Sequence, residues 1–234
     1  MIIDFTVENF LSFRDEQTLS FVAEPPYDIH SNHLLETPIK GLKLLKTVVI
    51  YGANASGKSN FLTALHRLKE IVLTSVQNAP NDPFKIMPFA LKKAKRLEPS
   101  NFEINFFYDE IKYNYSISLD ERNVYYEYLS YYPKKYKKNI FTRELNETGE
   151  YTYPFGEDLK PKRMYDDIAL RTANNGLFLS KAAQENSKFL KQVYDWFDEI
   201  LSEQSDLDDT AKAIYTDNQY KEKLLKFLCS QDIE

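Results

Sequence analysis

The chain has 234 residues, of which 43% are hydrophobic and 28% are charged, a balance typical of a soluble globular protein. Its formal net charge of −5 argues against a uniformly basic protein that coats nucleic acid. No apolar run approaches the roughly 20 residues that a membrane span needs, and the acidic N-terminus is unlike a signal or transit peptide. The single cysteine, Cys229, excludes an internal disulfide framework. A cytoplasmic protein with no membrane contact is therefore expected.

Two alternating stretches are predicted to form strands near the N-terminus. Apolar and polar residues alternate over residues 3–8 and again over residues 18–22, which is the period of a half-buried strand. Between them lies the run Asn9-Phe10-Leu11-Ser12-Phe13-Arg14. Residues 24–46 contain three prolines and no clear periodicity before residue 41, so a loop is expected there.

A phosphate-binding loop is predicted within residues 47–65. The sequence fits G-x-x-x-x-G-K-[ST], and average residue usage gives such a match by accident in about one per cent of chains of this length. The β-branched run at residues 48–50 predicts a strand that ends at the loop. Apolar residues at helical spacing over residues 61–76 predict a helix after it. A glycine-rich turn with an exposed lysine is the alternative, and both flanks argue against it.

The residue types of this loop suit phosphate chemistry. Gly52 and Gly57 let the backbone turn so that its N–H groups point inward, and the start of the helix adds partial positive charge. Lys58 is expected to reach the β- and γ-phosphates as the catalytic residue, and the Ser59 hydroxyl is expected to bind Mg²⁺. The sequence therefore predicts a chain that binds a nucleoside triphosphate with Mg²⁺.

The middle of the chain predicts an antiparallel β meander. Three alternating runs, at residues 102–108, 111–119 and 124–132, are separated by short polar turns, and further short strands are expected near residues 140–145 and 150–153. Many of the seventeen tyrosines lie here. We favour cross-strand aromatic packing for them over a platform on which nucleic-acid bases stack.

Asp109 and Glu110 follow an apolar run, as the Walker B pair of an AAA+ or RecA-like ATPase does. A Walker B strand is buried on both faces, whereas these residues join two alternating runs. The pattern therefore favours a hairpin turn. A self-sufficient AAA+-like ATPase that uses this pair remains the alternative.

A basic cluster surrounds Tyr136 and consists of Lys134, Lys135, Lys137 and Lys138. Aromatic and cationic side chains together suit nucleic acid, so the cluster is a candidate for contact with phosphates or for docking a partner. Such clusters are more often solvated loops, and we favour that interpretation.

Helical spacing returns in the last third of the chain. Apolar residues share one face over residues 189–201, and a last helix is expected to begin near Asp217. The run LSEQS at residues 201–205 is similar to the ABC signature, but Glu203 would place a carboxylate where that motif presents a glycine N–H to phosphate. It is therefore not taken as the signature.

Together these motifs resemble the N-terminal lobe of the SMC/RecF-type branch of ABC ATPases. The loop matches G-x-N-x-S-G-K-S-N, and residues 9–13 match the N-F-x-S-F that precedes it. Many relatives carry Arg where this chain has Leu11, and Arg14 is expected to substitute. The resemblance implies that nucleotide is bound by Gly52, Asn54, Ala55, Ser56, Gly57, Lys58, Ser59, Asn60, Ser12, Phe13 and Arg14. The run NNGLFLSKAAQEN also resembles ATPases of bacterial phage-defence (abortive-infection) systems.

The resemblance implies a mixed α/β fold, a P-loop NTPase lobe of ABC type with an antiparallel β meander and a C-terminal helical subdomain. Residues 1–170 would form the lobe and residues 171–234 the helical subdomain, with the signature and Walker B beyond residue 234. The implied function is the Mg-ATP-binding lobe of a sensor or motor subunit in antiviral defence, inactive as an ATPase by itself. ATP would pair two copies as a homo-oligomer, with a nuclease or toxin as partner. A nucleotide-gated scaffold without turnover is a further alternative.

Overall fold

The computed structural model describes residues 1–25, 31–54, 56–79 and 81–200. Contacts within the chain divide it into two units, Met1–Ile200 and Leu201–Glu234. The predicted helix near Asp217 and the run at residues 201–205 therefore lie outside the described residues. The division of the chain at residue 170 stays a prediction.

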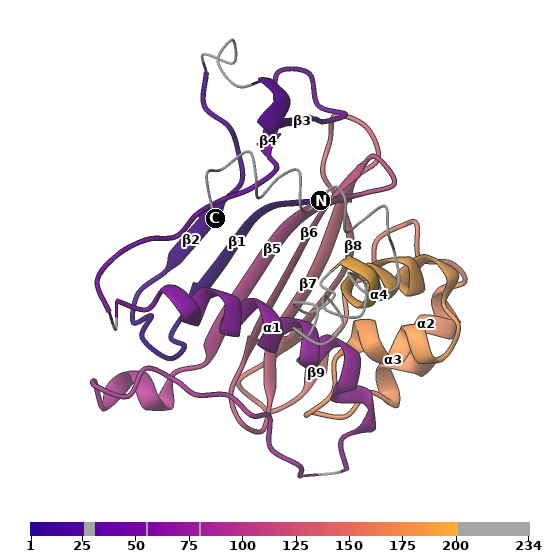
Figure 1. Ribbon diagram of the computed structural model, residues 1–234. Coiled ribbons are helices and arrows are strands. Elements are labelled where there is room, and N and C mark those ends of the chain that lie inside the picture. Colours follow the sequence, from indigo (N-terminus) through magenta and orange to yellow (C-terminus); the bar gives the residue numbers. More distant parts are fainter. Residues whose placement is uncertain (26–30, 55, 80, 201–234) are drawn as a thin grey trace, which may run out of the picture. The chain divides into compact units, whose positions relative to one another are not determined.

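A seven-stranded antiparallel sheet forms the centre of the first unit (Figure 1). Its strand order is β2-β1-β5-β6-β7-β8-β9. The strands are β1 (Ile2–Glu8), β2 (Gln17–Ser20), β5 (Ser100–Tyr108), β6 (Ile111–Leu119), β7 (Val124–Tyr132), β8 (Lys138–Leu145) and β9 (Tyr151–Thr152). The predicted meander is confirmed as β5 to β9, because each strand pairs with the next one along the chain.

Helices cover one face of this sheet (Figure 1). They are α1 (Lys58–Thr74), α2 (Lys162–Leu170), α3 (Phe178–Gln184) and α4 (Lys188–Ile200). The ring of Trp196 on α4 stacks on that of Phe106 of β5, with 3.7 Å between ring centres. The ring of Phe178 of α3 meets the ring of Phe141 of β8 edge to face, with 4.8 Å between ring centres. The predicted mixed α/β class is confirmed, as are the helices after residue 57 and around residues 189–200. Among the described residues, no helix combines the length and apolar character needed to cross a bilayer.

The two faces of the sheet differ because strand residues alternate. Phe5, Ile104 and Ile117 point into the helix-covered face and are almost fully buried. The other face carries Thr6, Glu103 and their cross-strand neighbours, which are partly exposed. Tyrosines divide in the same way, because Tyr115 and Tyr131 are buried with the helices and Tyr126 and Tyr128 lie on the open face. Cross-strand packing thus accounts for part of the predicted tyrosine cluster.

A buried ion pair joins the sheet to α3. Both oxygens of the Glu127 carboxylate accept backbone N–H bonds at the start of that helix, from Phe178 at 2.7 Å and Leu179 at 2.9 Å. Tyr115 donates a third bond at 3.0 Å, and the guanidinium of Arg143 lies 3.7 Å away. Burial raises the pKa of Glu127, and the Arg143 charge and the two N–H groups oppose that rise. The residue before α3, Leu177, has no side chain that could cap the helix. Glu127 takes that role, because its carboxylate accepts the free N–H groups at the start of α3.

The predicted strand at residues 48–50 is wrong for this structure. Residues 47–50 have no regular secondary structure and pair with no strand among the described residues, and Val49 is 77% exposed. A strand needs a hydrogen-bonded neighbour. In the main sheet β1 pairs with β2 and β5, and residues 48–50 are not part of that sheet.

The predicted loop at residues 24–46 is wrong in part. Two short strands, β3 (Leu34–Glu36) and β4 (Lys43–Leu45), pair there as a separate hairpin, preceded by the 3-10 helix η1 (Ser31–His33). Leu44 packs with Ile3 and Phe107, which ties this hairpin to the end of the main sheet.

The hairpin turn at Asp109 and Glu110 is confirmed. Tyr108 pairs with Ile111, so the two acidic residues form a two-residue loop. Their φ angles are 46° and 61°, as a type I′ turn requires at both central positions. Both side chains are exposed.

Candidate nucleotide-binding site

The phosphate loop leads directly into α1. Gly57 is the residue before the helix and has φ 92°, in the left-handed region that other residues avoid. A Cβ atom on Gly57 would lie 2.6 Å from the Ser12 Oγ atom, so the Ser12 side chain would have to move. The backbone angle therefore favours glycine here, and any other residue would also displace Ser12.

Lys58 closes the loop in this structure. Its ammonium group donates to the carbonyl oxygens of Gly52 at 2.9 Å and Ala53 at 2.7 Å. Asn54, Ser56 and Ser59 are exposed around it, and Ala55 lies outside the described residues. The backbone oxygen of Ser59 accepts a bond from the Thr63 hydroxyl. Ser59 itself is exposed at the start of the helix.

The predicted N-terminal motif contacts the start of α1. Asn60 donates to the Ser12 hydroxyl at 2.7 Å, and the rings of Phe13 and Phe61 lie 4.6 Å apart. Residues separated by 48 positions thus meet where the loop becomes a helix. The motif and the loop therefore contact each other.

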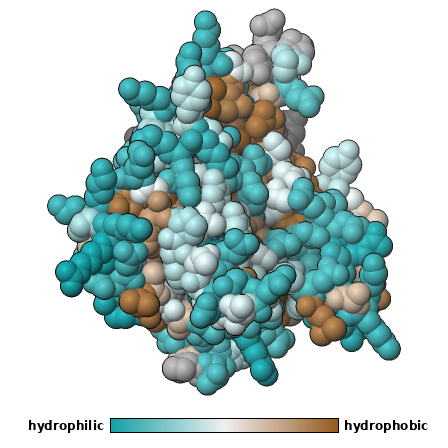
Figure 2. All heavy atoms as spheres, turned by 180° about the vertical axis from the view of Figure 1, so that it is seen from behind, coloured by the Kyte–Doolittle hydropathy of each residue, from teal (hydrophilic) through white to brown (hydrophobic). Residues whose placement is uncertain are grey.

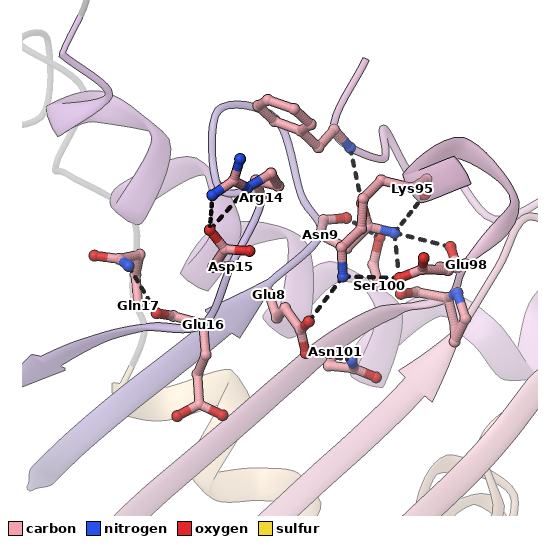
Figure 3. Close-up of polar contacts among 12 residues, drawn as sticks. Glu8, Asn9, Arg14, Asp15, Glu16, Gln17, Lys95, Glu98, Ser100 and Asn101 are labelled. Atoms are coloured by element: carbon pink, nitrogen blue, oxygen red, sulfur yellow. Dashed lines mark hydrogen bonds and ion pairs between the residues drawn. The ribbon is translucent and has the colours of Figure 1, made fainter. Parts of the chain in front are cut away.

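Asn9 of the motif supports this arrangement and is fully buried (Figure 3). Its amide nitrogen lies 2.7 Å from the carbonyl oxygen of Lys95 and 2.9 Å from that of Glu98, and its side-chain oxygen accepts from Phe89 N–H at 3.2 Å. The φ angle of Asn9 is 51°, which asparagine adopts more readily than most residues. Asn9 therefore connects the segment of residues 89–98 to the turn that carries Ser12.

An ion-pair network strengthens the same junction. The Lys95 ammonium lies 3.0 Å from Glu8 and 2.7 Å from Glu98 (Figure 3). Hydrogen bonds from Lys95 and then from Asn101 lower the pKa of Glu8. Lys95 belongs to a basic cluster with Lys92, Lys93 and Arg96, for which the sequence favours a solvated loop, and its ion pairs with Glu8 and Glu98 were not predicted.

An open hollow of about 370 Å³ lies beside the loop and is lined by Ser12, Phe13, Arg14, Asp15, Gln17, Ser56 and Phe89. Arg14 lines this hollow, and its guanidinium donates to Asp15 at 2.8 Å and 2.5 Å (Figure 3). The bond from Arg14 lowers the pKa of Asp15. Phe89, Asp15 and Gln17 were not predicted; the last two directly follow the motif, and Phe89 lies in a segment without periodicity.

Asp109 and Glu110 lie far from this site. Ser100, the first residue of β5, donates to the Asn9 carbonyl at 2.6 Å, whereas the acidic turn follows the last residue of the same strand. Nine strand residues span about 30 Å. The acidic pair therefore cannot act on a nucleotide held by this loop.

The site fits a nucleoside triphosphate with Mg²⁺. Gly57 has no side chain between the loop and Ser12, so the backbone is open to a ligand. The backbone N–H groups at the start of α1 favour phosphate. The exposed hydroxyl of Ser59 is a hard oxygen donor of the kind that Mg²⁺ prefers. The predicted residues Ser12, Phe13, Gly57, Lys58 and Asn60 contact one another or lie within one loop.

Comparison with known families gives a match over residues 48–228, which is more than half of the chain. The family is described as "AAA domain, putative AbiEii toxin, Type IV TA system". The matched span begins four residues before Gly52 and includes the loop, the sheet from β5 onward and the four α-helices. No curated protein matches the chain.

Proposed function

We infer that this chain, which belongs to that AAA-domain family, is a phosphate-loop ATPase domain that binds ATP together with Mg²⁺. The observation that carries the proposal is the contact of Ser12 with both Gly57 and Asn60. That contact brings the N-terminal motif to the phosphate loop of the matched family. It gives the loop a neighbour that can hold the rest of a nucleotide.

Lys58 binds the phosphates by exchanging its partners. Its ammonium group now donates to two loop carbonyls, and β- and γ-phosphate oxygens are stronger acceptors because they are charged. The backbone N–H groups of residues 57–59, at the start of α1, supply further positive potential. Ser59 holds Mg²⁺, which when bound neutralises phosphate charge.

The hollow beside the loop receives the nucleoside. Phe13 and Phe89 offer apolar ring surface, and Arg14 and Gln17 offer donors at its rim. The volume of about 370 Å³ suits one nucleoside. Adenine is proposed from the resemblance to ATPases, with Arg14 in the role that Leu11 cannot fill.

Hydrolysis needs more than the residues of this loop. Lys58 and Ser59 neutralise charge but do not position the attacking water. We assign that step, from the resemblance to SMC/RecF-like ATPases, to a signature and a Walker B pair beyond residue 234. Two copies paired by ATP would then complete each site as a homo-oligomer.

The description of the matched family, "putative AbiEii toxin, Type IV TA system", supports a role in defence. We propose a sensor or motor subunit of an antiviral defence system whose partner is an effector nuclease or toxin. Binding without turnover would instead indicate a nucleotide-gated scaffold, which measured ATP hydrolysis in the complete protein distinguishes.

Titration of Mg-ATP against the chain and its Lys58→Ala variant tests the proposal. Loss of the lysine should weaken binding at least about thirtyfold, because a charge-assisted contact to phosphate is removed. Lys188→Ala removes an exposed lysine on α4 and serves as the matched control, with unchanged affinity. Equal affinity in the Lys58 variant and the wild type would refute nucleotide binding at this loop.

A further inference from the structure

The face of the sheet opposite the helices is open and polar. Figure 2 shows the molecule from this side, where white and teal side chains of intermediate and low hydropathy predominate over the middle of the molecule. Cross-strand register aligns them in rows, one of which is Thr18, Thr6, Glu103, Ser116, Tyr128 and Thr142. None of the described helices covers this face in Figure 1.

Tyrosine and lysine side chains meet at one end of this face, on β6, β7 and the turn that follows. The Lys137 ammonium lies 4.8 Å from the centre of the Tyr128 ring, and the Lys112 ammonium lies 5.2 Å from that of Tyr132. The rings of Tyr126 and Tyr128 lie 6.0 Å apart and within 16° of parallel. Flat aromatic faces and cations thus occupy the same few strands.

The turn after β7 carries several lysines at this end of the face. Lys138 pairs with Asp158 at 3.0 Å, but Lys134, Lys135 and Lys137 have no carboxylate partner among the described residues. Asp4 and Glu103 accept from Asn105 and Asn114 on the neighbouring strands, and Glu144 lies opposite Tyr126. The lysines of the turn bring positive charge beside Tyr128, where Lys137 lies over the ring.

We propose that this end of the open face binds single-stranded nucleic acid. Lys134, Lys135 and Lys137 contact the phosphates, and bases stack on the rings of Tyr128 and Tyr132 in place of the lysine ammonium groups. The site is separate from the phosphate loop and does not depend on ATP binding. It revises the expectation that the basic cluster is only a solvated loop.

Single strands fit this surface better than the other partners do. Bases in a duplex are stacked on one another, so their faces are not available to a ring on a sheet. A protein partner would need buried apolar or aromatic contacts at its centre. Here the cross-strand neighbours of Tyr126 and Tyr128 are polar, namely Ser116, Ser118, Thr142 and Glu144.

The test is fluorescence-anisotropy titration of the full chain with a labelled twelve-nucleotide oligothymidylate, from 50 to 200 mM salt. With two to three phosphates contacted, log K should fall with log salt with a slope of about −1.4 to −2.1. Lys135→Glu with Lys137→Glu should weaken binding at least about tenfold. Lys85→Glu with Lys188→Glu makes the same change in net charge at exposed lysines elsewhere and should have little effect.

Stacking is tested separately from charge. Tyr128→Ser should weaken oligothymidylate binding about fivefold to a hundredfold while leaving the binding of heparin, a polyanion without bases, unchanged. Thermal unfolding of each variant verifies that it is folded, and Tyr132→Ser serves as the second variant if Tyr128→Ser is not. Equal loss in the two lysine doubles, equal binding of duplex DNA, or no binding at 50 mM salt would overturn the proposal.

Discussion

Different kinds of contact fix the antiparallel sheet and the phosphate loop in the structure. Each strand from β5 to β8 pairs with its neighbour in the sequence, and one face of every strand is buried under helices. The segment that leads into the phosphate loop, residues 47–51, pairs with no strand among the described residues, and Tyr51 is 91% exposed. Its position depends instead on Ser12 and Phe13, which reach it from the N-terminal turn. Local pairing specifies the sheet, and distant contacts specify the site.

The largest effect is expected at the buried pair that joins the sheet to α3. Glu127→Gln replaces an oxygen with an NH₂ group that faces a backbone N–H, and it leaves the Arg143 charge without its carboxylate. The free energy of unfolding should fall by about 3 to 5 kcal/mol, measured by urea denaturation. Glu144→Gln, on the exposed side of β8, should cost less than about 0.5 kcal/mol. Similar losses in both variants would show that the pair does not organise the sheet.

Gly57→Ala tests the distant contact at the loop. Alanine in the left-handed region costs about 1 to 2 kcal/mol, and its Cβ atom would also meet Ser12 at 2.6 Å. Gly149→Ala has φ 83° with no atom within 4 Å of the added Cβ, so it carries the backbone cost alone. We expect the Gly57 variant to be the less stable of the two and to bind Mg-ATP at least about tenfold more weakly than wild type.

Removal of the Ser12 side chain separates the cost of the backbone angle from the cost of the clash with Ser12. The double variant Gly57→Ala with Ser12→Gly should lose only as much stability as Gly149→Ala, which has no such clash. If the double variant is no more stable than Gly57→Ala, the contact between the motif and the loop does not exist in solution.

The acidic turn offers a smaller effect of opposite sign. Asp109→Asn with Glu110→Gly places the preferred residues of a type I′ turn at two positions of positive φ. The free energy of unfolding should rise by about 0.5 to 1 kcal/mol in urea denaturation. ATP hydrolysis by the complete protein should be unchanged, and a tenfold fall in kcat with the fold intact would restore the catalytic role for this pair.

The smallest effect is expected before the phosphate loop. Val49→Ser changes a residue that is 77% exposed and should alter the free energy of unfolding by less than about 0.5 kcal/mol. Val7→Ser makes the same change at a fully buried position of β1 and should cost about 2 kcal/mol or more. Equal costs would mean that residues 48–50 form a buried, paired strand after all.

The sequence predicts the meander well because its evidence is local. Alternation and a short polar turn lie within about twenty residues for each hairpin. The same alternation indicates that Glu127 faces inward with Leu129 and Tyr131. The pairing of β1 with β5 joins residues about a hundred positions apart. No periodic pattern identifies such a partner.

The site is predicted in part for the same reason. Glycine spacing identifies Gly52 and Gly57, and the motif identifies Ser12 and Phe13. Phe89 and Lys95 lie near the site because Asn9 bonds to the Phe89 N–H and to the Lys95 carbonyl. These bonds depend on the path of a segment without periodicity, so the sequence does not reveal them. The apolar run at residues 48–50 indicates a strand, but a strand forms only where a partner is present.

Amide hydrogen exchange with and without Mg-ATP tests most directly whether the motif and the loop form one nucleotide site. The account predicts added protection in residues 52–60 together with residues 10–14, because both border the same hollow. Exchange in β6 and β7 should not change, since these strands lie in the body of the sheet. Protection of the loop without protection of residues 10–14, or no protection at either, would contradict it.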